Sequence, residues 1–383
     1  MRILLAPDKF KGCLTALEVA QAMAEGIRRV IPDAQIDRCP MADGGEGTVS
    51  ALVAATNGKL LTRRVTGPLP EMKVDATFGM LGDGQTAVVE MAAASGLALL
   101  PISQRDPMAT TTFGTGELLM AAAEAGAKRI ILGIGGSATV DGGVGCAQAC
   151  GLPVLLEDGE PVSPTEPLCG RDLDSILMIK HGRGSPVERM QITVACDVVN
   201  PLFGPNGAAV VFGPQKGATP EQVKQLDDSL RRLAERTGKL EAASTLGAGA
   251  AGGLGFGMLA WFGATLASGV QTVINAVDLP SRLREVDLCI TGEGKLDEQT
   301  LHGKTPIGVA RAAKRAGIPC IALVGSLGAV PETFRADGLN AWFSICPGPI
   351  TLEQSMSNAR RLLADAAANA VALFKVHHSD KRG

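Results

Sequence analysis

Acidic and basic side chains gather in the stretch VDLCITGEGKLDEQTLHGKTPIGVA, residues 286–310. Its first six residues are mostly apolar and rich in β-branched types, which predicts a buried strand of a parallel sheet. Glycines flank Glu293, so we expect a tight turn that displays one carboxylate. Thr305 and the proline after it predict an N-cap and the first turn of a helix. Such a strand, loop and helix start can hold an anion at the carboxyl edge of an open α/β sheet.

Similar carboxylates and lysines recur in other glycine and proline turns, several of them directly after predicted strands. For any single carboxylate, a solvated turn or an N-cap is the commoner explanation. Together, carboxylates for Mg²⁺ and lysines for phosphate or carboxylate groups are what phosphoryl transfer requires. The acids are Asp8, Asp43, Glu46, Asp141, Asp197, Glu293 and Asp297, and the lysines are Lys11, Lys216, Lys295 and Lys304.

Glycine-rich motifs give weaker signals. Two G-x-G-x-x-[GA] matches occur, at residues 133–138 and 247–252, and only the first follows a clear strand. Each is about as readily a packing turn as a phosphate loop. Residues 303–305 have the ending of a P-loop, but Glu298 stands in place of its first glycine, which argues against that family. Of the four histidines only His302 falls in a candidate loop, where structural and substrate-adjacent roles are both open.

Composition narrows the class of protein. A chain of 383 residues favours two domains, and 46% hydrophobic with 20% charged residues indicates a globular, cytoplasmic protein. A net charge of −3 gives no general attraction to nucleic acid. Nine scattered cysteines without a C-x-x-C pair indicate reduced thiols. The N-terminus predicts a first strand instead of a signal peptide, and no apolar run is long enough to span a membrane.

The order of the predicted elements indicates the fold class. Both ends of the chain alternate strands and helices, which is typical of a parallel sheet, whereas the middle contains antiparallel hairpin signals. We therefore expect an α/β protein with a Rossmann-like open parallel sheet built from residues 1–64 and 284–383. Residues 65–283 would form an inserted mixed α/β domain. Inserted domains usually bind their ligand in the cleft beside the parent domain, and we expect the active site there.

Several of these stretches together resemble the bacterial glycerate kinases, in order and over nearly the whole chain. The resemblance implies a two-domain α/β fold and phosphorylation of D-glycerate that depends on ATP and Mg²⁺. Its expected product is 2-phosphoglycerate, with 3-phosphoglycerate as the alternative. The matching stretches are APDKFKGCLTA (6–16), ADGGEGT (42–48), EMAAASGL (90–97), GIGGSATVDGG (133–143), ACDVVNPLFGPNGAA (195–209), FGPQKGA (212–218), GAGAAGGLG (247–255) and ITGEGKLDEQTLHGKTPIGVA (290–310).

Three positions depart from that family pattern. The family often has serine where this chain has Lys9 and Cys13, and asparagine where it has Val140. A lysine at position 9 could change how the first loop holds an anion, and Val140 cannot take a polar role. The other lysines and acids match, so the expected activity is unchanged.

We assign roles to the candidate residues on this basis. Asp197 follows a strand and precedes Asn200, so we expect it to orient or deprotonate the reacting hydroxyl group, with most of the catalysis coming from positioning and charge neutralisation. The expected catalytic residues are Asp197, Lys216 and Lys295; the substrate-binding residues are Lys11, Asp8, Asn200 and Gln215; the nucleotide-binding residues are Gly133, Gly135, Gly136, Ser137, Gly249, Gly252 and Gly253; and the Mg²⁺ ligands are Asp43, Glu293 and Asp297.

Two other classes of protein remain open at this point. A nucleotide-dependent oxidoreductase could use the same glycine motifs, although neither is followed by a convincing helix and ribose-binding acid. A non-catalytic sugar-acid sensor would need an output module, and no basic terminal segment suggests one. The sequence does not determine the oligomeric state, and a homodimer is among the states that it leaves open.

Overall fold

The computed structural model describes residues 1–180, 184–298, 300, 304–328 and 332–379. The chain forms two compact units. Unit 1 comprises Met1–Asp43, Ser50–Asn57 and Val270–Gly383, and unit 2 comprises Gly44–Val49 and Gly58–Gly269. These limits lie near the expected boundaries at 64 and 284. Residues 59–64 belong to a strand that pairs in unit 2, and the helices between 270 and 283 lie in unit 1.

Unit 1 contains a five-stranded, wholly parallel sheet in the order β13-β12-β11-β1-β2. The strands are β1 (Arg2–Leu5), β2 (Gln35–Arg38), β11 (Leu288–Leu296), β12 (Cys320–Leu327) and β13 (Leu339–Ser344). The helices that lie wholly in unit 1 are α1 (Ala16–Val30), α11 (Leu279–Leu283), α12 (Thr305–Ala316), α13 (Thr333–Ala336), α14 (Leu352–Ser357) and α15 (Ala359–Ser379). The helices α2 (Thr48–Thr56) and α10 (Gly269–Ala276) begin at the boundary with unit 2.

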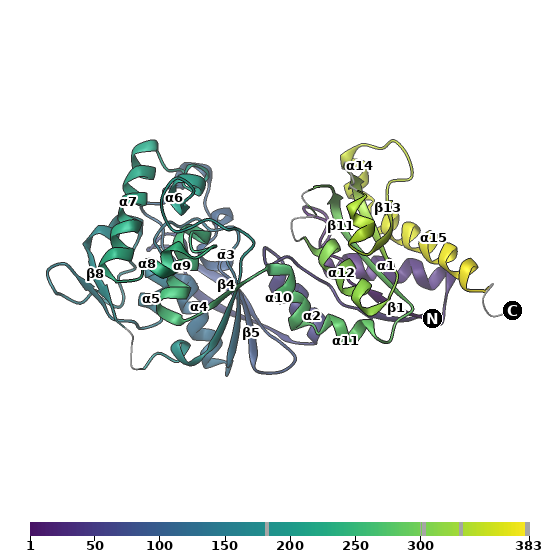
Figure 1. Cartoon of the computed structure of the whole chain (residues 1–383), viewed down its shortest axis with the longest axis horizontal. Coiled ribbons are helices and arrows are strands. Elements are labelled where there is room, and N and C mark those ends of the chain that lie inside the picture. The colour runs from purple at the N-terminus through teal and green to yellow at the C-terminus, as the bar shows by residue number, and fades with distance from the viewer. Residues whose placement is uncertain (181–183, 299, 301–303, 329–331, 380–383) are drawn as a thin grey trace. The chain divides into compact units, whose positions relative to one another are not determined.

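Both faces of this sheet are covered. Ile3 and Ile290 pack in one core with α1 and α15, two helices from opposite ends of the chain that lie side by side (Figure 1). Leu4 and Cys289 alternate with them in the strands and are equally buried, so they face the other side, where α12 packs on β11 and β12. The predicted α/β class, with a parallel sheet from both chain ends, is therefore confirmed.

Unit 2 contains a six-stranded mixed sheet in the order β10-β9-β6-β5-β4-β3. The strands β10, β9, β6 and β5 run parallel to one another, whereas β4 pairs antiparallel with both β5 and β3. The strands are β3 (Lys59–Thr66), β4 (Lys73–Met80), β5 (Thr86–Glu90), β6 (Arg129–Gly133), β9 (Gln191–Ala195) and β10 (Thr265–Ala267), and β7 (Val154–Leu156) pairs separately with β8 (Ile176–Ile179).

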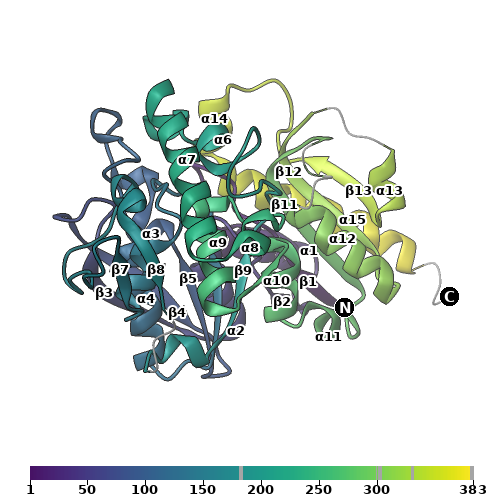
Figure 2. The same cartoon turned by 60° about the vertical axis from the view of Figure 1, so that its left-hand side comes forward.

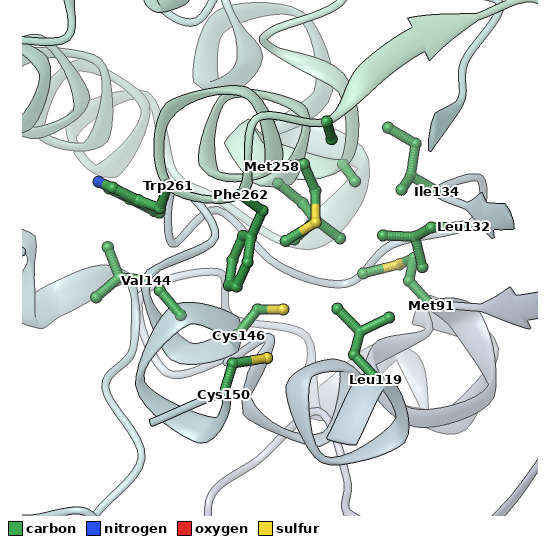
Figure 3. Packing of buried hydrophobic residues seen from close by; sticks show 14 of the residues in the cluster. Met91, Leu119, Leu132, Ile134, Val144, Cys146, Cys150, Met258, Trp261 and Phe262 are labelled. Atoms are coloured by element: carbon green, nitrogen blue, oxygen red, sulfur yellow. The ribbon is translucent and has the colours of Figure 1, made fainter. Parts of the chain in front are cut away.

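The helices of unit 2 pack around this sheet, and α4 lies on β3, β4 and β5 (Figure 2). The helices are α3 (Ala92–Ser95), α4 (Phe113–Glu124), α5 (Val144–Ala149), α6 (Ala208–Phe212), α7 (Pro220–Arg236), α8 (Leu240–Ser244) and α9 (Ala250–Phe262). Side chains of β5, β6, α4, α5 and α9 meet in one core, which Figure 3 shows around Met258 and Phe262. Cys146 and Cys150, one helical turn apart, are buried there, as expected of small core residues.

Local sequence signals explain several element ends. Thr15 caps α1 and Thr219 caps α7, each in a reciprocal capping box with the residue three positions later. Pro220 opens α7 as expected. The turn between β4 and β5 contains Gly84 in a left-handed conformation, which confirms the predicted hairpin.

The prediction of a tight turn around Glu293 was wrong. The strand β11 continues through both neighbouring glycines to Leu296, and neither glycine has a positive φ. A β-carbon at Gly292 would collide with the carbonyl oxygen of Leu323 on β12. Glycine is therefore required for close approach of two strands, and the carboxylate of Glu293 is displayed from a strand.

No helix in the described part of the chain is long and apolar enough to cross a membrane.

Candidate active site

The polar residues of unit 1 gather where β1 and β11 lie next to each other. The chain leaves β1 through α1 to β2 on one side, and leaves β11 through α12 to β12 on the other. Adjacent parallel strands whose connections diverge leave a crevice at their carboxyl ends, the usual ligand position in open α/β sheets. The loop after β1 stays in register with β11, since Asp8 N donates to Gly292 O at 2.9 Å.

Asp8 is a buried carboxylate at this point, with 8% of its surface exposed. Its two oxygens accept hydrogen bonds of 2.6 Å from Thr305 Oγ1 and from the backbone N–H of Lys9. Burial, together with the negative charge of Asp43, raises the pKa of Asp8 to about 6. Asp8 is therefore mostly ionised at neutral pH but is protonated more readily than an ordinary aspartate, and a bound cation would favour the ionised form.

Glu293 is the second buried carboxylate at the same edge. Its Oε1 accepts a 2.7 Å hydrogen bond from Thr300 Oγ1. Burial raises the pKa of Glu293 to about 7, the charges of Asp8 and Asp297 add to the rise, and the Thr300 hydrogen bond and Lys304 oppose it. The charges of Asp8 and Asp297 act on Glu293, and that of Asp43 acts on Asp8, so these acids lie near one another at this edge.

The remaining predicted residues of unit 1 surround this cluster. Asp297 forms an ion pair with Lys295 at 3.0 Å, in which the lysine is exposed and the aspartate largely buried. Lys11 is exposed, in the loop that lies against Gly294. Lys304 is the N-cap residue of α12, so Thr305, predicted as the cap, is instead its first helical residue, and its hydroxyl group reaches Asp8.

These carboxylates suit a hard cation that also binds water or phosphate oxygens. Among the described residues, no three Asp, Glu, His or Cys side chains are arranged to hold a metal by themselves. Mg²⁺ in phosphoryl-transfer sites usually takes one or two carboxylates and completes its shell with water and phosphate oxygens. One or two of the expected ligands Asp43, Glu293 and Asp297 would therefore suffice as the protein's share of a Mg²⁺ site.

A different polar group lies in unit 2, around a buried lysine. Lys216 is 2% exposed, and its Nζ donates to Ser137 Oγ at 2.7 Å and to Thr139 O at 2.8 Å. Burial lowers the pKa of Lys216 to about 7, and the negative charge of Asp141 partly opposes this. An ammonium group has three donors, so one is left for a ligand. Lys216 thus connects the glycine-rich loop after β6 to the turn 214–216.

The glycines expected to bind nucleotide fall into two kinds. Gly135 and Gly136 are exposed, and a β-carbon at Gly135 would find no atom closer than 3.6 Å. By contrast, β-carbons at Gly249 and Gly252 would collide with the backbone of residues 201 and 139. Close packing accounts for the second kind, to which Gly133 and Gly253 also belong. The first kind leaves the backbone accessible to a ligand.

Asp141 has a structural role. It is fully buried, and its carboxylate accepts hydrogen bonds from the N–H and the hydroxyl group of Thr112, both at 2.7 Å, and from Gly143 N at 3.0 Å. Burial raises its pKa, although these donors oppose the rise. Its hydrogen bonds fix the start of α5 to the segment before α4, and they leave little room for a role with substrate.

Asp197 lies after β9, where the parallel strands of unit 2 end. It is exposed, and its Oδ1 accepts a 3.0 Å hydrogen bond from Gly269 N. Asn200 donates to Asn206 O at 2.8 Å and so shapes its own loop. Gln215 is exposed beside Lys216. The described contacts thus place the predicted residues in separate groups, one around Asp8 in unit 1 and others at the edge of unit 2.

Sequence reasoning missed the residues that hold these side chains in place. Thr305 and Thr300 donate to the two buried acids, and Glu90 at the end of β5 accepts a 2.8 Å hydrogen bond from Val49 N. Glu90 carried one signal, since it ends a predicted strand within a stretch that matches the family. Nothing in the sequence indicated these contacts of the two threonines. Asp8 is distant from Thr305 in the sequence, and the end of β11 lies between Glu293 and Thr300. His302 lies outside the described residues.

Buried acids at the switch point of a parallel sheet, and a buried lysine beside an exposed glycine loop, are features that an α/β enzyme acting on phosphate groups requires. The chain belongs to the glycerate kinase family, whose model matches residues 3–375. This membership removes the oxidoreductase and sensor alternatives.

Individual relatives agree over their full lengths. The chain is 48% identical over 380 residues to a glycerate kinase of Bacillus subtilis (strain 168), and 44% identical over 380 residues to a glycerate 2-kinase of Escherichia coli (strain K12). Each alignment covers 98% of both chains. A solved structure described as glycerate kinase 2 from Salmonella typhimurium LT2 superposes with a TM-score of 0.89 at 45% identity, covering 99% of both chains.

Proposed function

We propose that this enzyme transfers the terminal phosphoryl group of ATP to the C2 hydroxyl group of D-glycerate, giving 2-phosphoglycerate and ADP with the help of Mg²⁺, in the cytoplasm. The relative from Escherichia coli that is named a glycerate 2-kinase supports the position of transfer. The observation that carries the proposal is the group of acids at the switch point, where Asp8 and Glu293 are held by hydroxyl donors. A cation bound to phosphate would compensate their burial.

The acids of unit 1 fit the binding of Mg²⁺. Asp43, Glu293 and Asp297 would hold the ion, which would neutralise charge on the transferring phosphoryl group and on the leaving group. The ammonium group of Lys295 is exposed and paired at 3.0 Å with Asp297. If Asp297 bound the metal, this ammonium group would be available to bind an anionic oxygen. Lys11 and Asp8 are proposed to contact glycerate.

The edge of unit 2 fits the binding of phosphate and the activation of the hydroxyl group. The accessible backbone of Gly135 and Gly136, with Ser137 held by Lys216, supports a role in binding the phosphates of ATP. Asp197 remains the proposed acceptor of the hydroxyl proton, since its backbone contact with Gly269 fixes an otherwise exposed carboxylate. Asn200 and Gln215 keep their proposed roles in binding substrate.

The experiment is a ³¹P NMR assay of purified enzyme with D-glycerate, ATP and Mg²⁺, with both phosphoglycerates as standards and L-glycerate as the control substrate. The expected result is a 2-phosphoglycerate signal with D-glycerate and no product signal with L-glycerate. A 3-phosphoglycerate signal would contradict the proposed position of transfer and leave the kinase activity intact. If D-glycerate gave neither product, the proposed activity would be wrong.

A further inference from the structure

Arg105 in unit 2 has a guanidinium group that finds no partner in the part of the chain that the structure describes. It follows the 3-10 turn Ile102–Gln104 and is half-buried. Its Nε–H group is buried and donates to no acceptor among the described residues. Within the described part of the chain, the guanidinium group takes part in no hydrogen bond and no ion pair. A buried charged donor that stays unsatisfied is costly, so its presence calls for an explanation.

Other arginines of the same unit show the contrast. Four of them pair with an acidic side chain, although three of the four are exposed to water, where a partner is less necessary. The pairs are Arg129 with Asp83 at 2.8 Å, Arg231 with Asp227 at 3.8 Å, Arg232 with Asp174 at 2.7 Å and Arg236 with Glu157 at 2.6 Å. Arg105 is thus half-buried without the partner that these arginines have.

The backbone of Arg105 lies directly beside the buried lysine of this unit. Gly217, the residue after Lys216, has a φ of 95°, and a β-carbon there would collide with the carbonyl oxygen of Arg105. The turn that carries Lys216 therefore packs on the turn that carries Arg105. Two cationic residues therefore lie on turns whose backbones are in contact, and the described contacts include no acid that pairs with Arg105.

The segment after Arg105 is fixed to the same surroundings. Asp106 Oδ1 accepts hydrogen bonds from Met108 N at 3.0 Å and from Gln222 Nε2 of α7 at 3.3 Å. Thr110 Oγ1 donates to Ala138 O at 3.0 Å, in the glycine-rich loop after β6. Contacts of the residues that follow Arg105 therefore fix its segment to α7 and to the glycine-rich loop after β6, without involving the Arg105 side chain.

We propose that Arg105 binds a phosphate group of the phosphoryl-transfer reaction, next to Lys216. A guanidinium group offers a planar set of donors that matches phosphate oxygens in pairs, and a preformed, unpaired fork gains most from such a ligand. The phosphate comes either from the nucleotide or from the phosphorylated product, and both present the same chemistry. The inference rests on the proposed function, because it names one more residue for that reaction.

The test measures binding without turnover, by isothermal titration calorimetry of Arg105→Met, Arg105→Lys and the wild type. The titrants are ADP and 2-phosphoglycerate, with adenosine and D-glycerate as their counterparts that lack phosphate. We expect Arg105→Met to lower the affinity for a phosphate-bearing ligand by about tenfold or more, while the affinity for the counterpart without phosphate stays unchanged. Arg105→Lys should recover only part of the lost affinity. Loss confined to ADP would assign the site to the nucleotide, and loss confined to 2-phosphoglycerate would assign it to the product.

A matched control is Arg63→Met. Arg63 is an exposed arginine of β3 whose guanidinium group donates a 3.5 Å hydrogen bond to the neighbouring carbonyl oxygen of Thr62, and the variant should bind all four ligands as the wild type does. The ligand-free melting temperature of Arg105→Met should equal or exceed that of the wild type, because no protein partner is lost. Unchanged affinity for both phosphate-bearing ligands, or a lowered melting temperature with uniform loss of all ligands, would overturn the inference. If Arg105 proved necessary for binding phosphate while D-glycerate was not phosphorylated, only the proposed function would fail.

Discussion

Thr305 Oγ1 donates a 2.6 Å hydrogen bond to Asp8 across 297 positions of sequence. The bond joins the first residue of α12 to the loop after β1, and both groups are buried. It therefore connects the two halves of the parallel sheet of unit 1 at the edge where the acids gather. Since it lowers the pKa of Asp8 against the effect of burial, it also helps to keep a carboxylate available there.

Replacing Thr305 with valine should reduce stability, because a buried carboxylate loses a donor while the shape of the side chain is kept. We expect a loss of about 1–3 kcal/mol in the free energy of unfolding, measured in urea at pH 7.5. Thr305→Ser keeps the hydroxyl group and is the control, with a smaller loss. An unchanged stability of Thr305→Val would mean that the hydrogen bond makes no net contribution.

The buried ammonium group of Lys216 should make stability depend on pH. Its pKa is lowered from 10.5 to about 7 in the folded protein, so between these values the unfolded state binds more protons than the folded state. Stability from this group therefore rises as the pH increases from about 7 towards 10.5, and the cost of burying the charge is fully present below pH 7. Between pH 7 and pH 9.5 the gain should be about 3 kcal/mol.

Lys216→Met isolates this contribution, because the difference between variant and wild type removes the titration of all other groups. The free energy of unfolding in urea, measured for both proteins at pH 6.5, 8 and 9.5, should shift in favour of the wild type as the pH increases. A difference that stays constant over this range would show that Lys216 titrates normally in the folded protein.

Two glycines with the same φ of 67° separate backbone strain from close packing. A β-carbon at Gly84 would meet nothing within 4 Å, whereas one at Gly252 would collide with the carbonyl oxygen of Thr139. Gly84→Ala should cost about 1–2 kcal/mol, the price of a left-handed residue. Gly252→Ala should cost clearly more, or prevent folding, as followed by circular dichroism. Similar costs would mean that the segment around Gly252 moves aside easily.

Much of the fold could be predicted because the signals are local. Thr15 and Thr219 lie immediately before amphipathic stretches and cap them as expected. The turn around Glu293 could not be predicted correctly, because the need for glycine there comes from Leu323 on a neighbouring strand. A glycine in a turn and a glycine in a crowded strand look alike until the strand order is known.

The candidate site could be predicted by residue type but not by role. Asp8 and Asp141 have the same appearance in sequence, a carboxylate in a turn after a strand. In the structure Asp8 lies at a switch point beside other acids, whereas the carboxylate of Asp141 is used by Thr112 and Gly143. Arg105 gave no signal at all, since a lack of partners is visible only once the surrounding side chains are placed.

Asp141→Asn should therefore act on stability. An amide has one acceptor oxygen and would turn N–H donors towards the backbone N–H groups that now bind the carboxylate. We expect a loss of about 2–4 kcal/mol in the free energy of unfolding, since a buried network is left partly unsatisfied. Kinetic constants of the fraction that remains folded at 20 °C should stay close to those of the wild type. A large fall in kcat without a loss of stability would give Asp141 a catalytic role.

Asp197→Asn should show the opposite behaviour. The side chain is exposed and its Oδ1 bond to Gly269 N can be kept by an amide oxygen, so the melting temperature should change little. An amide cannot accept the proton of the reacting hydroxyl group, and kcat for D-glycerate should fall about 100-fold or more, with a smaller change in KM. Asp75→Asn, at an exposed acid of β4, is the control and should keep full activity. Because phosphoryl transfer depends mainly on positioning and charge neutralisation, some activity should remain in Asp197→Asn. Near-normal kcat would remove Asp197 from the role of proton acceptor, and the buried pair Asp8 and Glu293 would then be the next carboxylates to replace.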